Sequence, residues 1–247
     1  MKRLARHAAA LAFLLALLPG CKATTGSSTA LTGPDAVLLA PEYPNLHLES
    51  LAYLGLHSLV PDAVAIQTTD GLLRSYLTGQ QQKFLIVDES TLRSRAMQQG
   101  VSGELARIVQ LWKDKGSIDR SILKSLGDKL GIDGVVAGSL GTWREEQVDW
   151  TSEGSSFTEV GIDVQIYESN TGILAWKGEK MERRESVHYR HEKSGTGIYS
   201  ESGGTAERTE RGDKIAPAPP PAEDVAESVV KNLVAGLPDK PAGAPLP

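Results

Sequence analysis

The stretch from Leu126 to Trp176 constrains the fold of this chain more than any other. It begins as the end of an amphipathic helical pattern and runs directly into the apolar segment VVAGSLG. After a polar turn, Phe157 to Glu168 alternate between apolar and polar residues, which is the period of a half-buried β-strand. Asn170-Thr171-Gly172 tolerates a positive φ, so we predict a hairpin that leads into a further strand from Leu174.

Two shorter apolar runs precede this stretch and predict further strands. Asp35 to Pro41 and Phe84 to Val87 each contain a compact apolar run next to turn residues. We interpret both as strands that are buried on both faces of a sheet. The Leu-rich segment from Tyr43 to Pro61 fits neither the helical nor the strand period, so no element is assigned to it.

Helical patterns lie between and after these strands. They span Asp62 to Gly79, Glu89 to Lys115, Asp119 to Gly131 and Asp224 to Leu237. A break is expected near Gly100 in the second, and Gly131 stands where a left-handed C-cap is needed in the third. The order of elements predicts the α/β (α+β) class, as a single domain with a mixed β-sheet of about five strands and helices packed against it.

The N-terminus has the layout of a secretory signal. Lys2, Arg3 and Arg6 form a basic segment ahead of the apolar segment Ala8 to Leu18. That segment is too short to span a bilayer as a helix, which takes about 20 residues. We therefore interpret it as part of a signal peptide rather than as a buried helix of the fold.

Cys21 is the single cysteine of the chain and directly follows Leu18-Pro19-Gly20. This resembles the bacterial lipobox, which implies cleavage before Cys21, acylation of its thiol and its new amino group, and a mature chain of 227 of the 247 residues. One acyl chain binds a membrane marginally, whereas two or more anchor a protein stably. We predict that Cys21 is the lipid attachment site, with a free thiol on an ordinary secreted protein as the alternative.

The predicted regions differ in composition. They are a signal peptide (1–20), a lipidated tether (21–34), an α/β domain (35–187), a polar and Pro-rich loop (188–221), a C-terminal helix that packs on the domain (222–238) and a disordered tail (239–247). Lys22, rather than an Asp, favours the periplasmic face of the outer membrane over retention in the inner membrane. Loss of the three basic residues of the leader changes the formal charge from −5 to −8, so nucleic acid is not an expected partner.

The residue patterns predict no catalytic, metal or cofactor site. His188 and His191 lie in a polar stretch that offers no third ligand. Ser121 and Lys124 have the spacing of a Ser-x-x-Lys motif but lie on an ordinary amphipathic helix. The neighbouring carboxylates Asp88-Glu89 are interpreted as a helix start. We therefore expect a protein that is not an enzyme, with a hydrolase of an unrecognised type as the alternative.

Two of the tryptophans are candidates for contact with a partner. Trp143 and Trp150 flank the polar turn before Phe157, whereas Trp112 and Trp176 are interpreted as core residues. The assignment of Trp143 and Trp150 to a partner surface competes with simple packing at the rim of the core.

Five segments carry a resemblance to a known group of domains. They are AVLLAP, GLLRSYL, FLIVDESTLRS, LGDKLGIDGVVAGSLG and VGIDVQIYESNTGILAW, between Ala36 and Trp176, and a last helix from Val225 to Leu237 would complete the set. They resemble the α/β domain shared by the curli-secretion lipoprotein CsgG, the peptidoglycan-synthase activator LpoB and the N-terminal domain of TolB. The resemblance implies a lipid-anchored, non-enzymatic module that binds another envelope protein, in wall synthesis or as a secretion accessory, and allows self-association.

The same resemblance implies an alternative, a subunit of an oligomeric outer-membrane secretion channel. A channel of that kind inserts two amphipathic hairpins per subunit, which here would lie at Thr142 to Thr158 and at Glu182 to Asp213. Both segments carry Arg and Glu side chains, and each Arg on a lipid-facing position costs about 2–4 kcal/mol near the membrane midplane. The sequence therefore favours the binding module over the channel.

Overall fold

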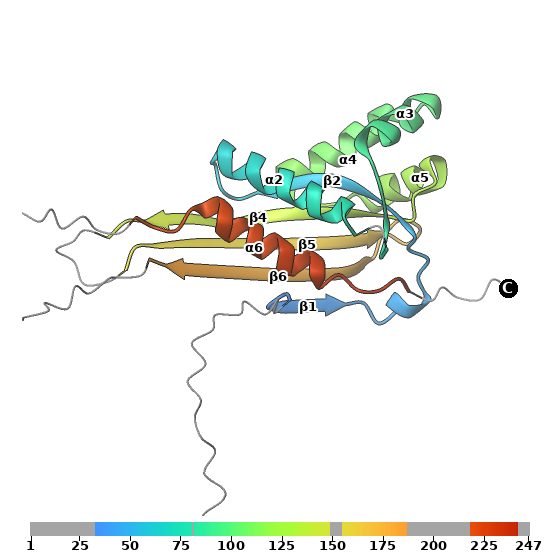
Figure 1. The fold of residues 1–247 in the computed structure, drawn as a ribbon. Coiled ribbons are helices and arrows are strands. Elements are labelled where there is room, and N and C mark those ends of the chain that lie inside the picture. Colours follow the sequence, from blue (N-terminus) through green and yellow to red (C-terminus); the bar gives the residue numbers. More distant parts are fainter. Residues whose placement is uncertain (1–32, 81, 149–154, 187–217, 242–247) are drawn as a thin grey trace, which may run out of the picture. The chain divides into compact units, whose positions relative to one another are not determined.

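The protein contains a six-stranded mixed β-sheet (Figure 1). The computed structural model describes residues 33–80, 82–148, 155–186 and 218–241. The strands are β1 (Ala36–Leu39), β2 (Ser50–Ser58), β3 (Leu85–Val87), β4 (Gly134–Glu146), β5 (Phe157–Glu168) and β6 (Leu174–Glu185). Their order across the sheet is β1-β6-β5-β4-β2-β3, with β2 parallel to β3 and β4 and all other pairs antiparallel. The predicted mixed sheet is confirmed, with six strands rather than about five.

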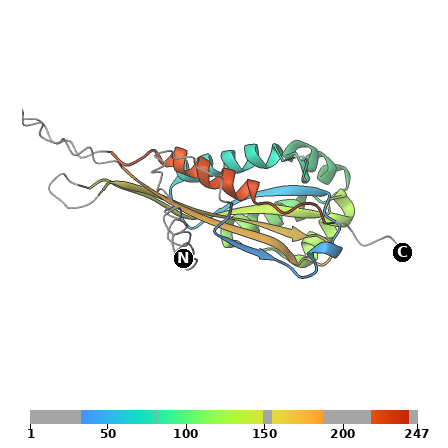
Figure 2. The same cartoon turned by 60° about the horizontal axis from the view of Figure 1, so that its bottom comes forward.

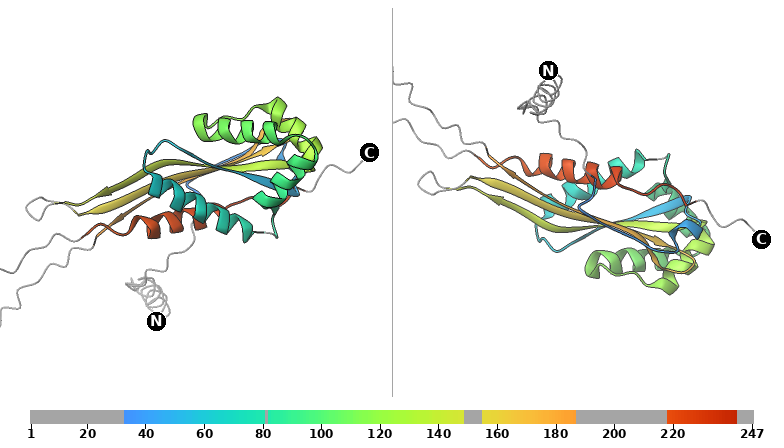
Figure 3. Two further views of the ribbon diagram at one scale, coloured as in Figure 1. Left: turned by 90° about the horizontal axis from the view of Figure 1, so that it is seen from above. Right: turned by 90° about the horizontal axis from the view of Figure 1, so that it is seen from below.

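Helices cover both faces of this sheet (Figure 3). On one face, α2 (Ala63–Thr78) and α6 (Ala222–Ala235) pack over a core that we call the first core, which includes Leu73, Val164 and Val229. On the other face, α3 (Glu89–Gln98), α4 (Ser102–Lys115) and α5 (Arg120–Leu130) pack over the second core, which includes Ile108 and Leu123. Figure 2 shows α2 and α6 side by side. The apolar stripes of the helices therefore face the sheet from two sides.

Aspartates begin three of the five described α-helices. The side chains of Asp62, Asp88 and Asp119 accept hydrogen bonds from the backbone N–H groups of the first turns of α2, α3 and α5. These bonds satisfy donors that have no partner inside a helix. The expected break at Gly100 is confirmed, since this residue has a φ of +69° between α3 and α4, and Gly131 is a left-handed C-cap as predicted.

The strand β2 lies in the segment to which the sequence pattern assigned no element. Its register with β4 shifts between Tyr53 and Leu56, and Gly55 in this bulge has a φ of +100°. Leu54 packs in the second core and Leu56 in the first, although two residues apart in a regular strand point to the same face. Because of this bulge, the side chains of β2 do not alternate regularly between the two faces, so the sequence pattern did not indicate a strand.

The interpretation of the two short apolar runs as doubly buried strands was wrong. The strand β1 is at one edge of the sheet, where Val37, Leu38 and Leu39 are 57, 51 and 48% exposed. The strand β3 is at the other edge, where Leu85 is 55% exposed. An apolar run indicates a strand, but its position in the sheet depends on pairing with distant segments.

The predicted hairpin after Glu168 is present. Gly172 has a φ of +68° in the turn between β5 and β6, as the sequence Asn-Thr-Gly indicated. Along β5 the residues Val160, Ile162, Val164 and Ile166 all lie in the first core, which confirms the predicted alternation. Most of the predicted polar and Pro-rich loop (188–221), namely 188–217, and most of the tail lie outside the described residues.

Candidate functional site

The structure describes only one of the three residues singled out as candidate sites. Cys21 and Trp150 lie outside the described residues. Trp143 is on β4, where it is half-buried and packs against the first core. Its assignment to a partner surface remains a prediction. The first core already covers part of the Trp143 side chain.

Two of the patterns for which no catalytic role is expected have structural roles. The hydroxyl of Ser121 donates a hydrogen bond of 2.6 Å to the carboxylate of Asp119, which caps α5. Asp88 caps α3, and Glu89 pairs with arginines of α2 and α3. The pair Asp88-Glu89 therefore begins a helix, as its position indicated. His188 and His191 lie outside the described residues.

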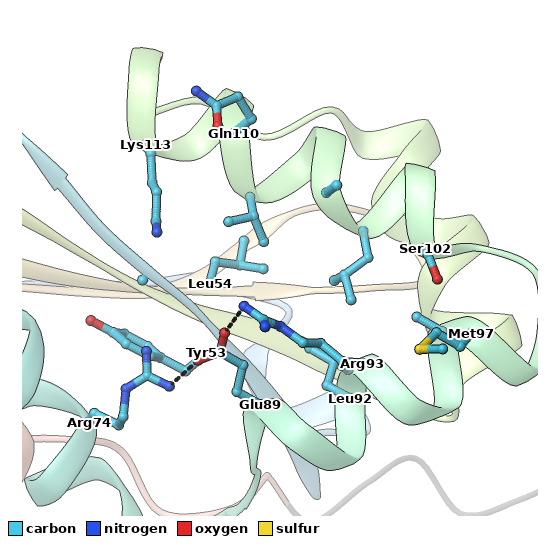
Figure 4. A pocket seen from close by; sticks show the side chains of 15 residues that line it. Tyr53, Leu54, Arg74, Glu89, Leu92, Arg93, Met97, Ser102, Gln110 and Lys113 are labelled. Atoms are coloured by element: carbon cyan, nitrogen blue, oxygen red, sulfur yellow. Dashed lines mark hydrogen bonds and ion pairs between the residues drawn. The ribbon is translucent and has the colours of Figure 1, made fainter.

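A hollow with both apolar and charged side chains lies between α3, α4 and the edge of β2. We call it the α3–α4 groove. Its volume is about 470 Å³, within the roughly 300–1,000 Å³ typical of binding pockets. Figure 4 shows its side chains, which converge from four elements: α2 contributes Arg74, β2 contributes Tyr53 and Leu54, α3 contributes Glu89, Leu92 and Arg93, and α4 contributes Leu105 and Lys113.

One wall of the groove is apolar. Leu92 and Ala96 of α3 face Leu105 and Val109 of α4, and Leu54 of β2 lies beneath them. Four of these five side chains are largely buried within the second core, and Val109 is half-buried. Met97, at the rim, is 74% exposed. The groove therefore extends the second core to the protein surface.

The opposite end of the groove is charged. Arg74 Nη1 lies 2.7 Å from Glu89 Oε2, and Arg93 pairs with the other oxygen of the same carboxylate. Arg74 also lies over the ring of Tyr53, with its guanidinium carbon 5.3 Å from the ring centroid. The hydroxyl of Tyr53 donates a hydrogen bond of 2.8 Å to Asp70. One carboxylate thus serves two guanidinium groups, and a cation–π contact orients one of them (Figure 4).

Lys113 is the basic residue of the groove that has no such partner. Within the described part of the chain, its ammonium group makes no hydrogen bond or ion pair, and Figure 4 shows its side chain directed toward Tyr53 and Arg74. With Arg74, Arg93 and Glu89, it gives the lining a formal charge of +2, and Asp70, which pairs with Arg74, reduces the local charge to +1. The overall charge of the chain is −5. The groove is therefore a locally basic site on an acidic protein.

The protonation states of the charged end follow from its contacts. Burial raises the pKa of the Tyr53 phenol well above its usual range, and Asp70 adds to this shift. Burial opposes the charged form of Arg74, but Asp70 and Glu89 outweigh it and raise the pKa of this guanidinium. At neutral pH Tyr53 is therefore neutral and Arg74 is charged.

The bulge of β2 shapes the floor of the groove. A Cβ atom on Gly55 would lie 3.1 Å from Cε of Lys113 and 3.8 Å from both Nζ of Lys113 and Oδ1 of Asp70. The side chain of Lys113 therefore lies in the space that a side chain at Gly55 would take. The sequence analysis missed this site because its residues come from four separate segments, and among them only Glu89 was weighed as a functional residue.

A second, shallower hollow of about 340 Å³ lies where β1, β4, β5 and β6 meet. Polar side chains at this hollow already have partners within the protein. Lys180 pairs with Asp35, and Gln165 donates a hydrogen bond of 2.8 Å to Asp163. Near the ends of the long strands, the guanidinium carbon of Arg183 stacks 3.6 Å from the ring centroid of Phe157. These contacts are internal to the sheet and offer a ligand less than the α3–α4 groove does.

Neither a metal cluster nor a membrane-spanning helix occurs in the part of the chain that the structure describes. Its residues form no group of three or more His, Cys, Asp or Glu side chains able to hold a metal ion. None of its helices has both the length and the apolar content that crossing a bilayer requires.

The chain has no match among protein-family models, and no curated protein matches its sequence. It is similar in structure to a lipoprotein from Neisseria meningitidis, with 15% identity and a TM-score of 0.40 over 56% of this chain and 84% of the other. It is also similar to PelC from Paraburkholderia phytofirmans, described as a dodecamer, with 11% identity and a TM-score of 0.40 over 81% and 94% of the two chains.

A third similar structure is the C-terminal domain of LpoB from Salmonella enterica, with 16% identity and a TM-score of 0.37 over 56% of this chain and 84% of the domain. At these identities and scores, the similarities assign neither a family nor a function to this chain.

Proposed function

We propose that this protein is a non-enzymatic binding module of the bacterial cell envelope, held at the periplasmic face of the outer membrane through acyl chains on Cys21, and that it docks another envelope protein in the α3–α4 groove. The observation that carries the proposal is the groove itself. It joins an apolar wall to a basic end at the protein surface, and such a combination provides both burial energy and orientation for a partner.

The lipid anchor is supported by the sequence around the single cysteine. Cys21 follows Leu18-Pro19-Gly20 at the end of an apolar segment, and a small polar stretch separates it from β1. A tether of this kind leaves the domain free to meet a partner while the acyl chains hold it near the membrane.

Photo-crosslinking from the rim of the groove tests the docking site. A photoreactive phenylalanine analogue replaces Met97, which is 74% exposed at the rim, or Val64, which is 66% exposed on α2 and does not line the groove. In cells of the bacterium, we expect the Met97 variant to form a discrete cross-linked species with an envelope protein and the Val64 variant to form none. Equal cross-linking from both positions, or none from Met97, would reject the groove as the docking site.

A separate measurement tests the anchor. The Cys21→Ser variant should incorporate no labelled palmitate and should move from the membrane fraction to the soluble fraction. Membrane attachment as firm as that of the parent protein would contradict the predicted acylation.

A further inference from the structure

We propose that the segment bound in the α3–α4 groove is an extended peptide of the partner that carries an acidic residue beside apolar ones: it lies along the open edge of β2, with its carboxylate next to Lys113. This inference rests on the proposed function and specifies the chemistry of the partner. Three independent features of the groove carry it, namely the strand edge, the charge and the apolar wall.

The edge of β2 is open beside the groove. The strand β3 pairs only with Ser50, Leu51 and Ala52, whereas β2 continues to Ser58. On this edge, the carbonyl of Glu49 accepts a hydrogen bond of 2.8 Å from the N–H group of Leu85. Within the described residues, no strand pairs with this edge of β2 after Ala52, whereas β4 pairs with the other edge. An extended peptide placed there would continue the row that β3 begins, which is how strand addition recognises a polypeptide backbone.

Charge selects an acidic peptide. Lys113 has no partner within the described part of the chain, and Arg93 shares the carboxylate of Glu89 with Arg74. A carboxylate brought next to Lys113 would pair with an ammonium group that is already close to the apolar wall. A basic segment would instead add to a local charge that is already positive.

The apolar wall selects the neighbours of that acidic residue. Leu54, Leu92 and Leu105 line the same hollow of about 470 Å³ as the charged side chains. In an extended peptide, alternate side chains point to the same side, so one apolar side chain two residues from the acid would face this wall. At Gly55 the position of a Cβ atom would lie 3.1 Å from Cε of Lys113, so the side chain of Lys113 runs directly beside this part of β2.

Selection from a peptide library tests this chemistry. The mature chain, solubilised in detergent with its acyl chains in place, is used to select displayed peptides of about eight residues, slightly longer than an average strand. We expect enrichment of sequences in which Asp or Glu alternates with Leu, Ile, Val or Phe. Enrichment of basic sequences, or no bias in charge, would overturn the proposal.

Matched variants then locate the selected peptide. Fluorescence anisotropy should show at least about tenfold weaker binding to Lys113→Glu, equivalent to about 1.4 kcal/mol, and less than about twofold weaker binding to Lys115→Glu. Both lysines lie in the last turn of α4, but Lys115 does not line the groove, so the two variants alter the helix end alike. A peptide with Lys in place of its acidic residue should recover affinity for Lys113→Glu. Equal losses in the two variants would overturn the placement.

Two further probes separate a strand from other occupants. Methylation of alternate backbone nitrogens of the peptide should abolish binding for one set of positions and leave the other set unaffected, because a strand uses only every second residue on one edge. Equal effects of both sets would reject strand addition. Tighter binding of dodecanoate than of any selected peptide would show that the groove takes an acyl carboxylate and would also overturn the proposal.

The outcomes distinguish this inference from the proposed function. If Met97 cross-links to an envelope protein but the library yields no acidic and apolar sequences, the groove is supported as the docking site and the acidic, apolar peptide is rejected as its ligand. If neither result is obtained, both proposals fall.

Discussion

The indole Nε1 of Trp112 donates a hydrogen bond of 3.2 Å to the carbonyl oxygen of Gly55, in the bulge of β2. The same N–H group lies 3.2 Å from the carbonyl oxygen of Gly138 on β4. Trp112 is fully buried, so these two carbonyl groups depend on the protein for a donor. A single side chain thus holds α4 against two neighbouring strands and positions Lys113, the next residue, at the groove.

Replacement of Trp112 by Phe should destabilise the protein by about 2–4 kcal/mol, since it removes the shared donor and leaves a cavity. Chemical denaturation measures the free energy of unfolding. The half-buried Trp143 offers a control, because Trp143→Phe should cost about 1 kcal/mol or less. Similar losses for the two variants would contradict the role assigned to the indole N–H group.

The glycine at the start of β4 should not accept a side chain. A Cβ atom on Gly134 would lie 2.4 Å from the carbonyl oxygen of Tyr167, a backbone atom that cannot rotate away. Gly134→Ala should therefore cost more than about 2 kcal/mol in a denaturation experiment. Gly71, exposed within α2, has no neighbouring atom within 4 Å of such a Cβ, so Gly71→Ala should stabilise the protein by about 0.5–1 kcal/mol.

The carboxylate of Asp133 joins the loop before β4 to the start of β2. It accepts hydrogen bonds from the N–H group of Ser50 at 2.8 Å and from the N–H group of Glu49 at 3.0 Å. Burial alone would raise the pKa of Asp133, but the hydrogen bonds from Ser50 and Glu49 outweigh it and lower this pKa. A lowered carboxyl pKa stabilises the fold above its unfolded value of about 3.9, and this contribution is lost as the pH falls through the folded value.

The variant Asp133→Asn should accordingly destabilise the protein by about 1–3 kcal/mol near neutral pH. The difference from the parent protein should shrink as the pH falls below about 4, where this carboxyl group becomes protonated in the unfolded chain, until it is also protonated in the fold at lower pH. Melting temperatures measured over this range provide the check. A difference that does not depend on pH would show that the charge of Asp133 contributes nothing.

Asp163 is expected to behave in the opposite way. Burial on the sheet face raises its pKa, and Glu179 adds to the shift, while Gln165, Lys177 and His57 oppose it. A raised carboxyl pKa favours the protonated form in the fold, so the related stability is present below the unfolded pKa and is lost as the pH rises through the folded value.

Asp163→Asn should therefore raise the melting temperature near neutral pH, by roughly 1–3 °C, which corresponds to less than about 1 kcal/mol for a chain of this size. The gain should vanish toward about pH 3, where the parent side chain is itself neutral. The isosteric amide keeps a hydrogen-bond acceptor for Gln165. A lower melting temperature at neutral pH would contradict the expected direction.

Local signals in the sequence were sufficient for the helices and the hairpin. Asp88 and Asp119 cap helices that begin within three residues of them, and Gly172 turns the chain between two neighbouring strands. Such features depend on hydrogen bonds and backbone conformations that span only a few residues. The prediction of an anchor at Cys21 likewise rests on a short local pattern.

The exposure of β1 and β3 illustrates what such signals do not contain. Leu38 and Leu85 belong to apolar runs of the same character as those of the central strands, yet the pairing of distant segments puts both at sheet edges. Whether a strand lies at the edge or in the centre of the sheet depends on which other strands pair with it. The residues that determine this pairing are distributed over the whole chain.

The sequence by itself determined the class of the fold, the beginnings of its helices, the hairpin between β5 and β6 and the expectation of a lipid-anchored protein. Only the tertiary structure decided that β2 exists, that its bulge turns Leu54 and Leu56 to opposite faces, and that Arg74, Arg93 and Lys113 meet in one groove. The physical reason is that a cap or a turn is stabilised by its own neighbours, whereas a bulge and a groove are stabilised by packing between elements far apart in the chain.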